Sequence, residues 1–332
     1  MPTETVNILV TAPIGEDCRQ RIAATSPRVN LLDVADLSRA DHQRDPAAKK
    51  ELDARLAEAE VIFAFRLPDN LLARAPKLRW IQVMSAGVDR FLDKELLQSP
   101  VMLTNVSGIH ATPIGEFVLS LMLMFVKQAP LFFEMKQRKH WERFTPEVLR
   151  GKTVGVVGLG SIGREVARLA KAFGMRVIAT RRSAKRAARA RYVDLLLPRE
   201  QLPRLLADSD FVVIALPLTS ETGKFIGEAE LRAMKPTACI INIGRGQLID
   251  EEALVRALSE KWIAGAGLDV FATEPLPADS KLWELPNVIF SPHIAGGMED
   301  YLTQATEVFC ENLRRYLNGK KLLTLVGKKR GY

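Results

Sequence analysis

The sequence predicts an α/β protein with two doubly wound domains, each built on a parallel sheet. Short apolar runs alternate with helical segments over the first hundred residues, and the same alternation begins again at residue 151. The chain has 332 residues, and single hydrophobic cores generally stop growing before this size. We therefore expect two separate cores.

The first hundred residues contain five runs with the length and composition of strands. Two helices are expected among them, one over 47–60 and one that opens with Asp89 as its cap. Strands that alternate with helices form parallel sheets covered on both faces. The five expected strands are 7–11, 29–34, 61–65, 78–84 and 101–106.

A strongly apolar helix is expected from residue 112 to about 129, with Pro113 in its first turn. Its most apolar stretch, FVLSLMLMFV, has ten residues, which is too short to cross a bilayer, so we expect no membrane association. Its apolar content exceeds one buried face, so we expect it to form interdomain and homodimer contacts. The segment 130–150, rich in charged and aromatic residues, is expected to be a connector.

The second alternation predicts the second parallel sheet. A helix near 298–317 and a basic tail follow it, and we expect the tail to be solvated. The expected strands are formed by KTVGVVG, MRVIAT, FVVIALP, ACIINIG, IAGAGLDV and NVIFSPH.

The excess of positive charge is confined to two short segments. Of 47 basic residues, six lie within 179–191 and five within 318–332, and the remaining 36 are balanced by 39 acidic residues. No basic face for nucleic acid is therefore expected. The three cysteines are far apart and the N-terminus lacks a signal-peptide pattern, so we expect a reducing cytoplasm and no metal site.

The segment GLGSIG has the G-x-G-x-x-G spacing between an expected strand and an expected amphipathic helix. Gly158 allows a tight turn, Gly160 lets the backbone approach a pyrophosphate, and Gly163 lets the helix pack closely on the strand. The helix N-terminus, beginning with Ser161 and Ile162, offers N–H groups and partial positive charge to the phosphates. The segment therefore predicts a dinucleotide site. The helix is expected to bury Ile162, Val166, Leu169 and Phe173 and to end at Gly174.

The next strand, MRVIAT, ends in two arginines. Arg181 lies 18 residues beyond the last glycine of the loop, where an NAD site places an acidic residue on the ribose 2′-hydroxyl. An arginine cannot accept that hydrogen bond, but it can bind a 2′-phosphate through charge-assisted hydrogen bonds. Arg181 and Arg182, with Thr180 and Ser183 as hydroxyl donors, therefore indicate NADP, with NAD as the weaker cofactor. The alternative is a solvated basic helix that continues through Arg191.

Three further segments lie at the C-terminal ends of expected strands, where open α/β sheets bind their ligands. They are INIGRGQLIDEEAL (241–254), GAGLDVFATEPLP (265–277) and FSPHIAGG (290–297). Together with GLGSIG, PLTSETGKFIG (217–227) and VMSAGVDRF (83–91), they resemble the D-2-hydroxyacid dehydrogenase family over nearly the whole chain. The resemblance implies a flavodoxin-like substrate domain, 1–104 and 292–332, and an inserted Rossmann cofactor domain, 105–291. It also implies an active site in the cleft between them, closed by hinge motion.

These segments contain the groups that reduction of a 2-keto acid requires. Arg245, flanked by two glycines, supplies a forked cation that can hold the carboxylate and polarise the carbonyl. His293 is the natural proton donor because an imidazole titrates near neutral pH. Glu274 can hydrogen-bond the other imidazole nitrogen, which favours the imidazolium and holds the ring in place. The resemblance assigns these three residues as the family's catalytic trio.

The resemblance implies further contacts with substrate and cofactor. Ser85, Ala86 and Gly87 match the loop whose backbone N–H groups bind the substrate carboxylate. Asp269 matches the residue that contacts the nicotinamide carboxamide. Matches to residues that line the cofactor groove are Pro217, Thr222 and Ile243.

We therefore expect a cytoplasmic, homodimeric oxidoreductase that reduces a small 2-keto acid, glyoxylate or hydroxypyruvate, to the D-2-hydroxy acid with NADPH. Trp141 matches a position from which related reductases reach a partner's active site, and a packing role is the alternative. His110 lies near the expected hinge and is interpreted as structural. Glu274 argues against a formate dehydrogenase, which lacks this glutamate.

Three other functions stay open at this point. Some members of the family act as dinucleotide-sensing corepressors, in which partner binding carries the function. Phosphoglycerate dehydrogenases without a regulatory domain and relatives that oxidise phosphonate or other anions share the same motifs.

Overall fold

The computed structural model describes residues 5–331 and divides the chain into two compact α/β units, which confirms the predicted fold class. The first unit comprises the chain up to Ile109 together with the C-terminal segment from Met298, and the second unit comprises His110–Gly297. Both boundaries lie a few residues beyond the expected ones. At the second boundary this is because the buried carboxylate of Asp269 accepts hydrogen bonds from the Ile294 and Ala295 N–H groups and ties this segment to the second unit.

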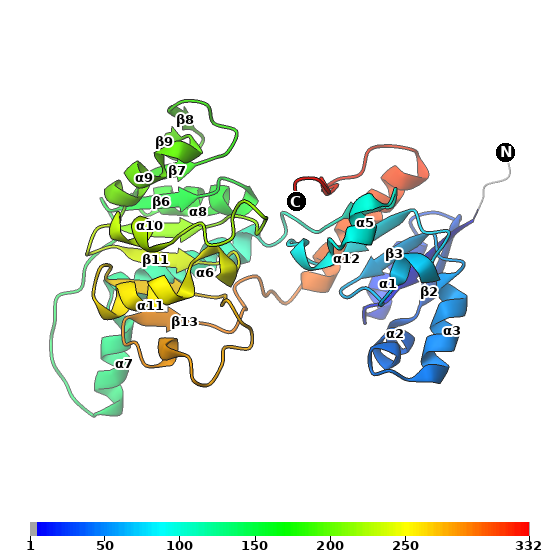
Figure 1. Ribbon diagram of the computed structural model, residues 1–332, viewed down its shortest axis with the longest axis horizontal. Coiled ribbons are helices and arrows are strands. Elements are labelled where there is room, and N and C mark those ends of the chain that lie inside the picture. The colour runs from blue at the N-terminus through cyan, green and yellow to red at the C-terminus, as the bar shows by residue number, and fades with distance from the viewer. Residues whose placement is uncertain (1–4, 332) are drawn as a thin grey trace. The chain divides into compact units, whose positions relative to one another are not determined.

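The first unit is built on a five-stranded parallel sheet with the order β2-β1-β3-β4-β5 (Figure 1). This is the flavodoxin-like order. Buried side chains form one cluster with Leu52 and Leu56 and another with Ile22 and Phe309, so helices cover both faces of the sheet. The strands are β1 (Val6–Val10), β2 (Val29–Asp33), β3 (Val61–Ala64), β4 (Trp80–Val83) and β5 (Met102–Thr104). The helices are α1 (Glu16–Ala23), α2 (Ala35–His42), α3 (Pro46–Leu56), α4 (Leu71–Arg74), α5 (Lys94–Gln98) and α12 (Tyr301–Leu317).

The helix expected to open at Asp89 begins later in the chain. Asp89 starts only a short 3-10 turn, and the α5 helix is capped by Asp93, whose carboxylate accepts a hydrogen bond from the Leu96 N–H at 2.7 Å. The prediction was wrong because two aspartates four residues apart offer the same kind of cap. Only the backbone conformation decides between them.

The expectation of a solvated tail is confirmed for four of its five basic side chains, Lys320, Lys321, Lys329 and Arg330, which are exposed. It is wrong for the backbone of the tail, which is docked on the first unit. Leu325 forms an antiparallel bridge with Thr104 at the edge of the sheet. Asn312 donates to the carbonyl of Leu323 at 3.2 Å and accepts from its N–H at 2.7 Å. The Lys328 ammonium donates to carbonyl groups at the end of α5, and burial lowers the pKa of this lysine.

The second unit is built on an eight-stranded sheet with the order β13-β12-β11-β10-β6-β7-β9-β8 (Figure 1). All neighbouring strands are parallel except β8 and β9. The order reverses next to β6, as in dinucleotide-binding sheets. The strands are β6 (Thr153–Val157), β7 (Arg176–Thr180), β8 (Ala188–Ala190), β9 (Val193–Leu197), β10 (Phe211–Ile214), β11 (Cys239–Asn242), β12 (Gly265–Leu268) and β13 (Val288–Phe290). The helices are α6 (Ala111–Val126), α7 (Ala129–Gln137), α8 (Ser161–Ala172), α9 (Leu202–Asp208), α10 (Glu228–Arg232) and α11 (Glu251–Ser259).

The apolar helix α6 packs inside the second unit. A Cβ added to Gly265 would lie 2.9 Å from the Phe125 ring, and one added to Gly267 would lie 3.1 Å from Leu121. The glycines of β12 therefore make room for α6, and this contact explains much of the apolar content of the helix. No single helix in residues 5–331 is long and apolar enough to cross a membrane. Helices α6 and α7, bent by 65°, pass that test only as a pair.

Two further segments of the second unit differ from expectation. The basic stretch is not a helix: after β7 it forms a turn and then the β8–β9 hairpin at the edge of the sheet. The segment expected to be a connector begins with α7, and only the part beyond it is irregular. In α8 the buried side chains are those of Val166, Ala167 and Ala170, whereas Phe173 is 40% exposed.

Candidate active site

The glycine loop joins β6 to α8 and leaves an open approach to the helix N-terminus. Gly158 has a φ of +104°, and a Cβ there would lie 2.6 Å from the Ala215 carbonyl oxygen. A Cβ on Gly163 would lie 2.1 Å from the Gly158 carbonyl oxygen, so helix and strand can approach only with glycine there. Gly160, the N-cap residue, has nothing within 4 Å of its Cβ position. The loop therefore has space for a phosphate at the positive end of a twelve-residue helix.

The end of β7 lies directly beside this loop. The Gly158 N–H donates to the Thr180 carbonyl at 3.2 Å, which joins the two segments. Arg181, Arg182 and Ser183 are exposed and form a turn, whereas the Thr180 side chain is buried. Two guanidinium groups therefore follow the strand end next to the glycine loop. Thr180 contributes its backbone there, and its role as a hydroxyl donor stays a prediction.

The residues expected in the cofactor groove follow β10, which is the neighbour of β6 in the sheet, and β11, which is the next strand beyond β10. Pro217 and Thr222 belong to one turn, in which the Thr222 hydroxyl donates to the Pro217 carbonyl at 2.8 Å. Ile243 is buried immediately after β11. These three residues therefore lie at the same edge of the sheet as the glycine loop, since the strands are parallel.

Glu274 and His293 form a hydrogen-bonded pair. Nδ1 of His293 lies 2.7 Å from Oε2 of Glu274, and Oε1 of Glu274 accepts from the Phe271 N–H at 3.0 Å. The carboxylate is therefore fixed by the backbone on one side and orients the imidazole on the other. Among residues 5–331, nothing hydrogen-bonds Nε2 of His293, and 49% of this side chain is exposed. Nε2 can therefore exchange a proton with a bound molecule.

Asp269 holds the backbone that presents His293. Its carboxylate is buried and accepts from the Ser291 hydroxyl at 2.7 Å and from the Ile294 and Ala295 N–H groups at 2.8 and 3.0 Å. Its carbonyl accepts from the His293 N–H at 2.9 Å. His293 has a φ of +55°, a left-handed conformation that is costly for a non-glycine residue and persists only where neighbours fix it. Sequence reasoning missed this supporting role, and contact of Asp269 with a nicotinamide stays a prediction.

Arg245 follows β11 between two crowded glycines. A Cβ on Gly246 would lie 1.8 Å from the Phe271 carbonyl carbon, and one on Gly244 would lie 2.9 Å from the Leu216 carbonyl oxygen. The Arg245 Nη1 donates to the Gly244 carbonyl at 2.8 Å. Because β11, β12 and β13 are adjacent and parallel, the segments that carry Arg245, Asp269 and His293 leave the same edge of the sheet.

The remaining candidate residues lie elsewhere in the two units. Ser85, Ala86 and Gly87 follow β4 in the first unit and are half-buried. His110 is half-buried beside Gly296, and burial lowers its pKa, which fits a structural residue. Trp141 follows α7 and is 90% exposed, so the structure does not bury it within its own unit.

The family model described as D-isomer specific 2-hydroxyacid dehydrogenase, NAD binding domain, matches residues 119–295. A glyoxylate reductase from Thermococcus gammatolerans is 37% identical over 273 residues, which cover 80% of this chain and 80% of the relative.

Solved structures give the same kind of match. A D-isomer specific 2-hydroxyacid dehydrogenase from Xanthobacter autotrophicus, in complex with NADPH and MES, has a TM-score of 0.84 and 29% identity, covering 99% of this chain and 100% of that one. An NADPH-dependent glyoxylate/hydroxypyruvate reductase from Sinorhizobium meliloti, in complex with NADP and sulfate, has a TM-score of 0.84 and 27% identity, with the same coverage.

Proposed function

The chain belongs to the D-isomer specific 2-hydroxyacid dehydrogenase family, and we propose that it reduces glyoxylate or hydroxypyruvate to the D-2-hydroxy acid with NADPH. The observation that carries this proposal is the Glu274–His293 pair, at 2.7 Å, with Nε2 of the imidazole open. Sequence similarity to glyoxylate reductases over most of the chain supports the substrate class.

Each residue of the trio has one role in this reaction. Arg245 binds the substrate carboxylate through its guanidinium and draws electron density from the carbonyl. A bound nicotinamide cofactor would supply the hydride for the carbonyl carbon. His293 donates the proton on Nε2 to the carbonyl oxygen, which becomes the hydroxyl group. Glu274 holds Nδ1, so that the ring presents Nε2 throughout the reaction.

The proposed preference for NADP rests on Arg181 and Arg182. Both are exposed at the end of β7, and the Thr180 carbonyl that precedes them accepts a hydrogen bond from the Gly158 N–H of the glycine loop. A hydrogen bond to a charged group contributes roughly 1.5–3 kcal/mol, which corresponds to about tenfold or more in affinity. NADPH is therefore bound more tightly than NADH, and NADH is the weaker cofactor.

The proposal is tested by two measurements on the wild-type protein. Fluorescence titration with NADPH and NADH gives the two dissociation constants, and a substrate panel of glyoxylate, hydroxypyruvate and pyruvate gives kcat/KM with each cofactor. We expect tighter binding of NADPH and the largest kcat/KM for glyoxylate or hydroxypyruvate. Binding of NADPH without turnover of any keto acid would contradict the proposal and favour a dinucleotide sensor.

We also propose that the protein is a homodimer, with α7 and the segment that follows it as the contact surface. Figure 1 shows that α7 and the loop after it stand out from the body of the second unit. The large apolar side chains of this region are exposed: Phe132 is 42%, Phe133 54%, Trp141 90% and Val148 58% exposed. Exposed apolar patches mark contact surfaces. Sedimentation velocity should give a dimer for the wild type and a monomer for Phe133→Asp.

A further inference from the structure

The loop after β4 presents three consecutive backbone N–H groups. Met84 is still part of the strand ladder, since its N–H donates to the Ala64 carbonyl at 2.8 Å. For the N–H groups of Ser85, Ala86 and Gly87, residues 5–331 provide no hydrogen-bond acceptor. Half-buried N–H groups generally find a partner, and consecutive ones form sites for anions. This loop is therefore suited to bind a carboxylate.

The carbonyl groups of the same loop are all engaged. The acceptor–donor pairs are Met84 O with the Tyr301 hydroxyl, Ser85 O with the Val106 N–H at 3.3 Å, Ala86 O with Nδ2 of Asn105 at 2.7 Å, and Gly87 O with the Ser85 hydroxyl at 2.8 Å. A trans peptide unit is planar, so its C=O and N–H point in opposite directions. A donor that fixes the carbonyl of one residue therefore also fixes the direction of the next residue's N–H.

Two of these donors are side chains from other parts of the first unit. Tyr301, in the first turn of α12, fixes the peptide unit that carries the Ser85 N–H. Its ring lies 5.8 Å from the Phe65 ring, and burial raises the pKa of Tyr301 to about 12. The phenol therefore stays a donor at physiological pH. Asn105, which is 7% exposed, fixes the unit that carries the Gly87 N–H.

We propose that Tyr301 and Asn105 are positioning residues that direct the N–H groups of Ser85 and Gly87 toward the substrate carboxylate. This inference rests on the proposed function, and it takes the Ser85–Gly87 loop as the carboxylate-binding loop that the resemblance to the family implies. The two side chains act on the substrate through the peptide units that they hold.

The test compares Tyr301→Phe with Tyr316→Phe. Both tyrosines belong to α12, and the Tyr316 hydroxyl donates to Glu60, which lies outside the loop. Each variant loses one hydroxyl and keeps its ring. For both proteins we would measure the melting temperature, kcat and KM for glyoxylate with NADPH, the Kd of NADPH, and the Kd of oxamate for the NADPH complex. Oxamate serves as a carboxylate probe that is not reduced.

We expect Tyr301→Phe to raise the KM of glyoxylate and the Kd of oxamate by roughly three- to tenfold, the effect of one lost neutral hydrogen bond. Its kcat and its Kd for NADPH should stay within about twofold of wild type, because a hydrogen bond that serves binding alone changes KM. Asn105→Ala should act in the same direction. Tyr316→Phe should leave all four constants unchanged, although its melting temperature should fall by about as much as that of Tyr301→Phe.

Equal KM and oxamate Kd values for the two tyrosine variants would overturn the inference, as would a loss confined to kcat. If the wild type reduces no keto acid, the proposed function fails, and the oxamate titration decides the inference separately. Weaker oxamate binding by Tyr301→Phe than by Tyr316→Phe would then support it. Absence of oxamate binding to the wild-type NADPH complex would overturn it.

Discussion

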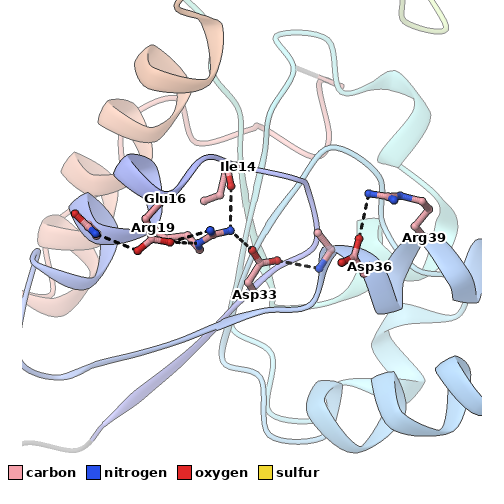
Figure 2. A network of polar contacts seen from close by, with 8 residues as sticks. Ile14, Glu16, Arg19, Asp33, Asp36 and Arg39 are labelled. Atoms are coloured by element: carbon pink, nitrogen blue, oxygen red, sulfur yellow. Dashed lines mark hydrogen bonds and ion pairs between the residues drawn. The ribbon is translucent and has the colours of Figure 1, made fainter.

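Arg19 in the first unit and His293 in the second unit each bind carboxylates, but they differ in what remains available for chemistry. Arg19 donates to Glu16 at 2.9 Å, to Asp33 at 2.7 Å and to the Ile14 carbonyl at 3.1 Å, and Figure 2 shows its guanidinium enclosed by these groups. The His293 side chain forms a hydrogen bond only through Nδ1, with Glu274, and its Nε2 has no hydrogen-bond partner within residues 5–331.

The surroundings of Arg19 show why a cavity with charged walls does not by itself indicate a site. A cavity of about 240 Å³ is lined by Arg19, Asp33 and Asp36. However, Glu16 and Asp33 already satisfy the guanidinium and raise the pKa of Arg19, while Asp36 pairs with Arg39 (Figure 2). The Glu274–His293 pair comprises fewer groups than the Arg19 cluster. However, Nε2 of His293, the atom proposed to exchange a proton, has no hydrogen-bond partner within residues 5–331. In the proposed function, this open atom is what distinguishes a catalytic pair from a structural one.

The largest effect is expected for His293→Ala. Loss of a general acid should lower kcat for glyoxylate by a factor on the order of 10² or more, with the Kd of NADPH unchanged. His42→Ala is the control, because His42 of α2 also hydrogen-bonds through Nδ1, to the Ser38 carbonyl at 2.6 Å, and has no proposed role in the reaction. Steady-state kinetics of the two variants would separate a catalytic histidine from a structural one. A kcat near wild type for His293→Ala would contradict the proposal that His293, unlike Arg19, takes part in the reaction.

Glu274→Gln should have the next largest effect. Glutamine keeps an oxygen for the Phe271 N–H, but it lacks the charge and can turn its amide toward Nδ1. We expect kcat to fall by roughly tenfold or more, and by less than for His293→Ala. Glu58→Gln, which removes a carboxylate paired with Lys77 in the first unit, is the control and should have wild-type kcat. Equal kcat values for the two glutamine variants would show that Glu274 does not support the imidazole.

Arg181→Asp should change the cofactor preference and leave the chemistry intact. The aspartate repels a 2′-phosphate and can accept from a 2′-hydroxyl, so the ratio of kcat/KM for NADPH to that for NADH should fall by about tenfold or more. Arg189→Asp, which changes the same charge on the exposed edge strand β8, is the control. If both variants shift the ratio equally, the effect is one of net charge. If neither shifts it, the arginines form only a solvated patch.

The smallest effect is expected for Arg19→Met, which removes the cation from the closed cluster. The kcat/KM for glyoxylate should stay within about twofold of wild type, as is usual for surface changes away from a site. Arg19 lowers the pKa of Glu16, so the cluster stabilises the folded state above the ordinary glutamate pKa of 4.5 and loses this contribution as the pH falls through the lowered value. The melting temperature of Arg19→Met should therefore be slightly lower than wild type at neutral pH, and the difference should vanish in acid. A large loss of kcat/KM would show that this cluster is not merely structural.

The features that could be predicted from the sequence are those with a local cause. Gly158 and Gly163 are required where the backbone turns and where helix meets strand, so their spacing predicts the loop that the structure contains. The strands of both sheets follow from short apolar runs. The trio is suggested by residue type and by the ends of neighbouring strands, and the structure brings Glu274 and His293 together.

The features that could not be predicted depend on contacts between distant segments. Asn312 holds the tail through the backbone of Leu323, and no local pattern shows that contact. Asp269 supports His293 from 24 residues away, by accepting hydrogen bonds from the N–H groups of His293 and Ile294. The direction of these N–H groups depends on the folded backbone and cannot be predicted from a sequence pattern. The β8–β9 hairpin was missed because its basic residues are typical of a solvated segment, whereas its pairing depends on the sheet edge beside it.

The central claim is that Glu274 acts through His293, and a double-mutant cycle on kcat tests it most directly. If Glu274 acts only by holding the imidazole, Glu274→Gln should cause no further loss of kcat in a protein that already carries His293→Ala. The double variant and the His293→Ala variant should then have the same kcat for glyoxylate with NADPH. A double variant whose loss is the product of the two single losses would contradict the account, because Glu274 would then act independently of His293.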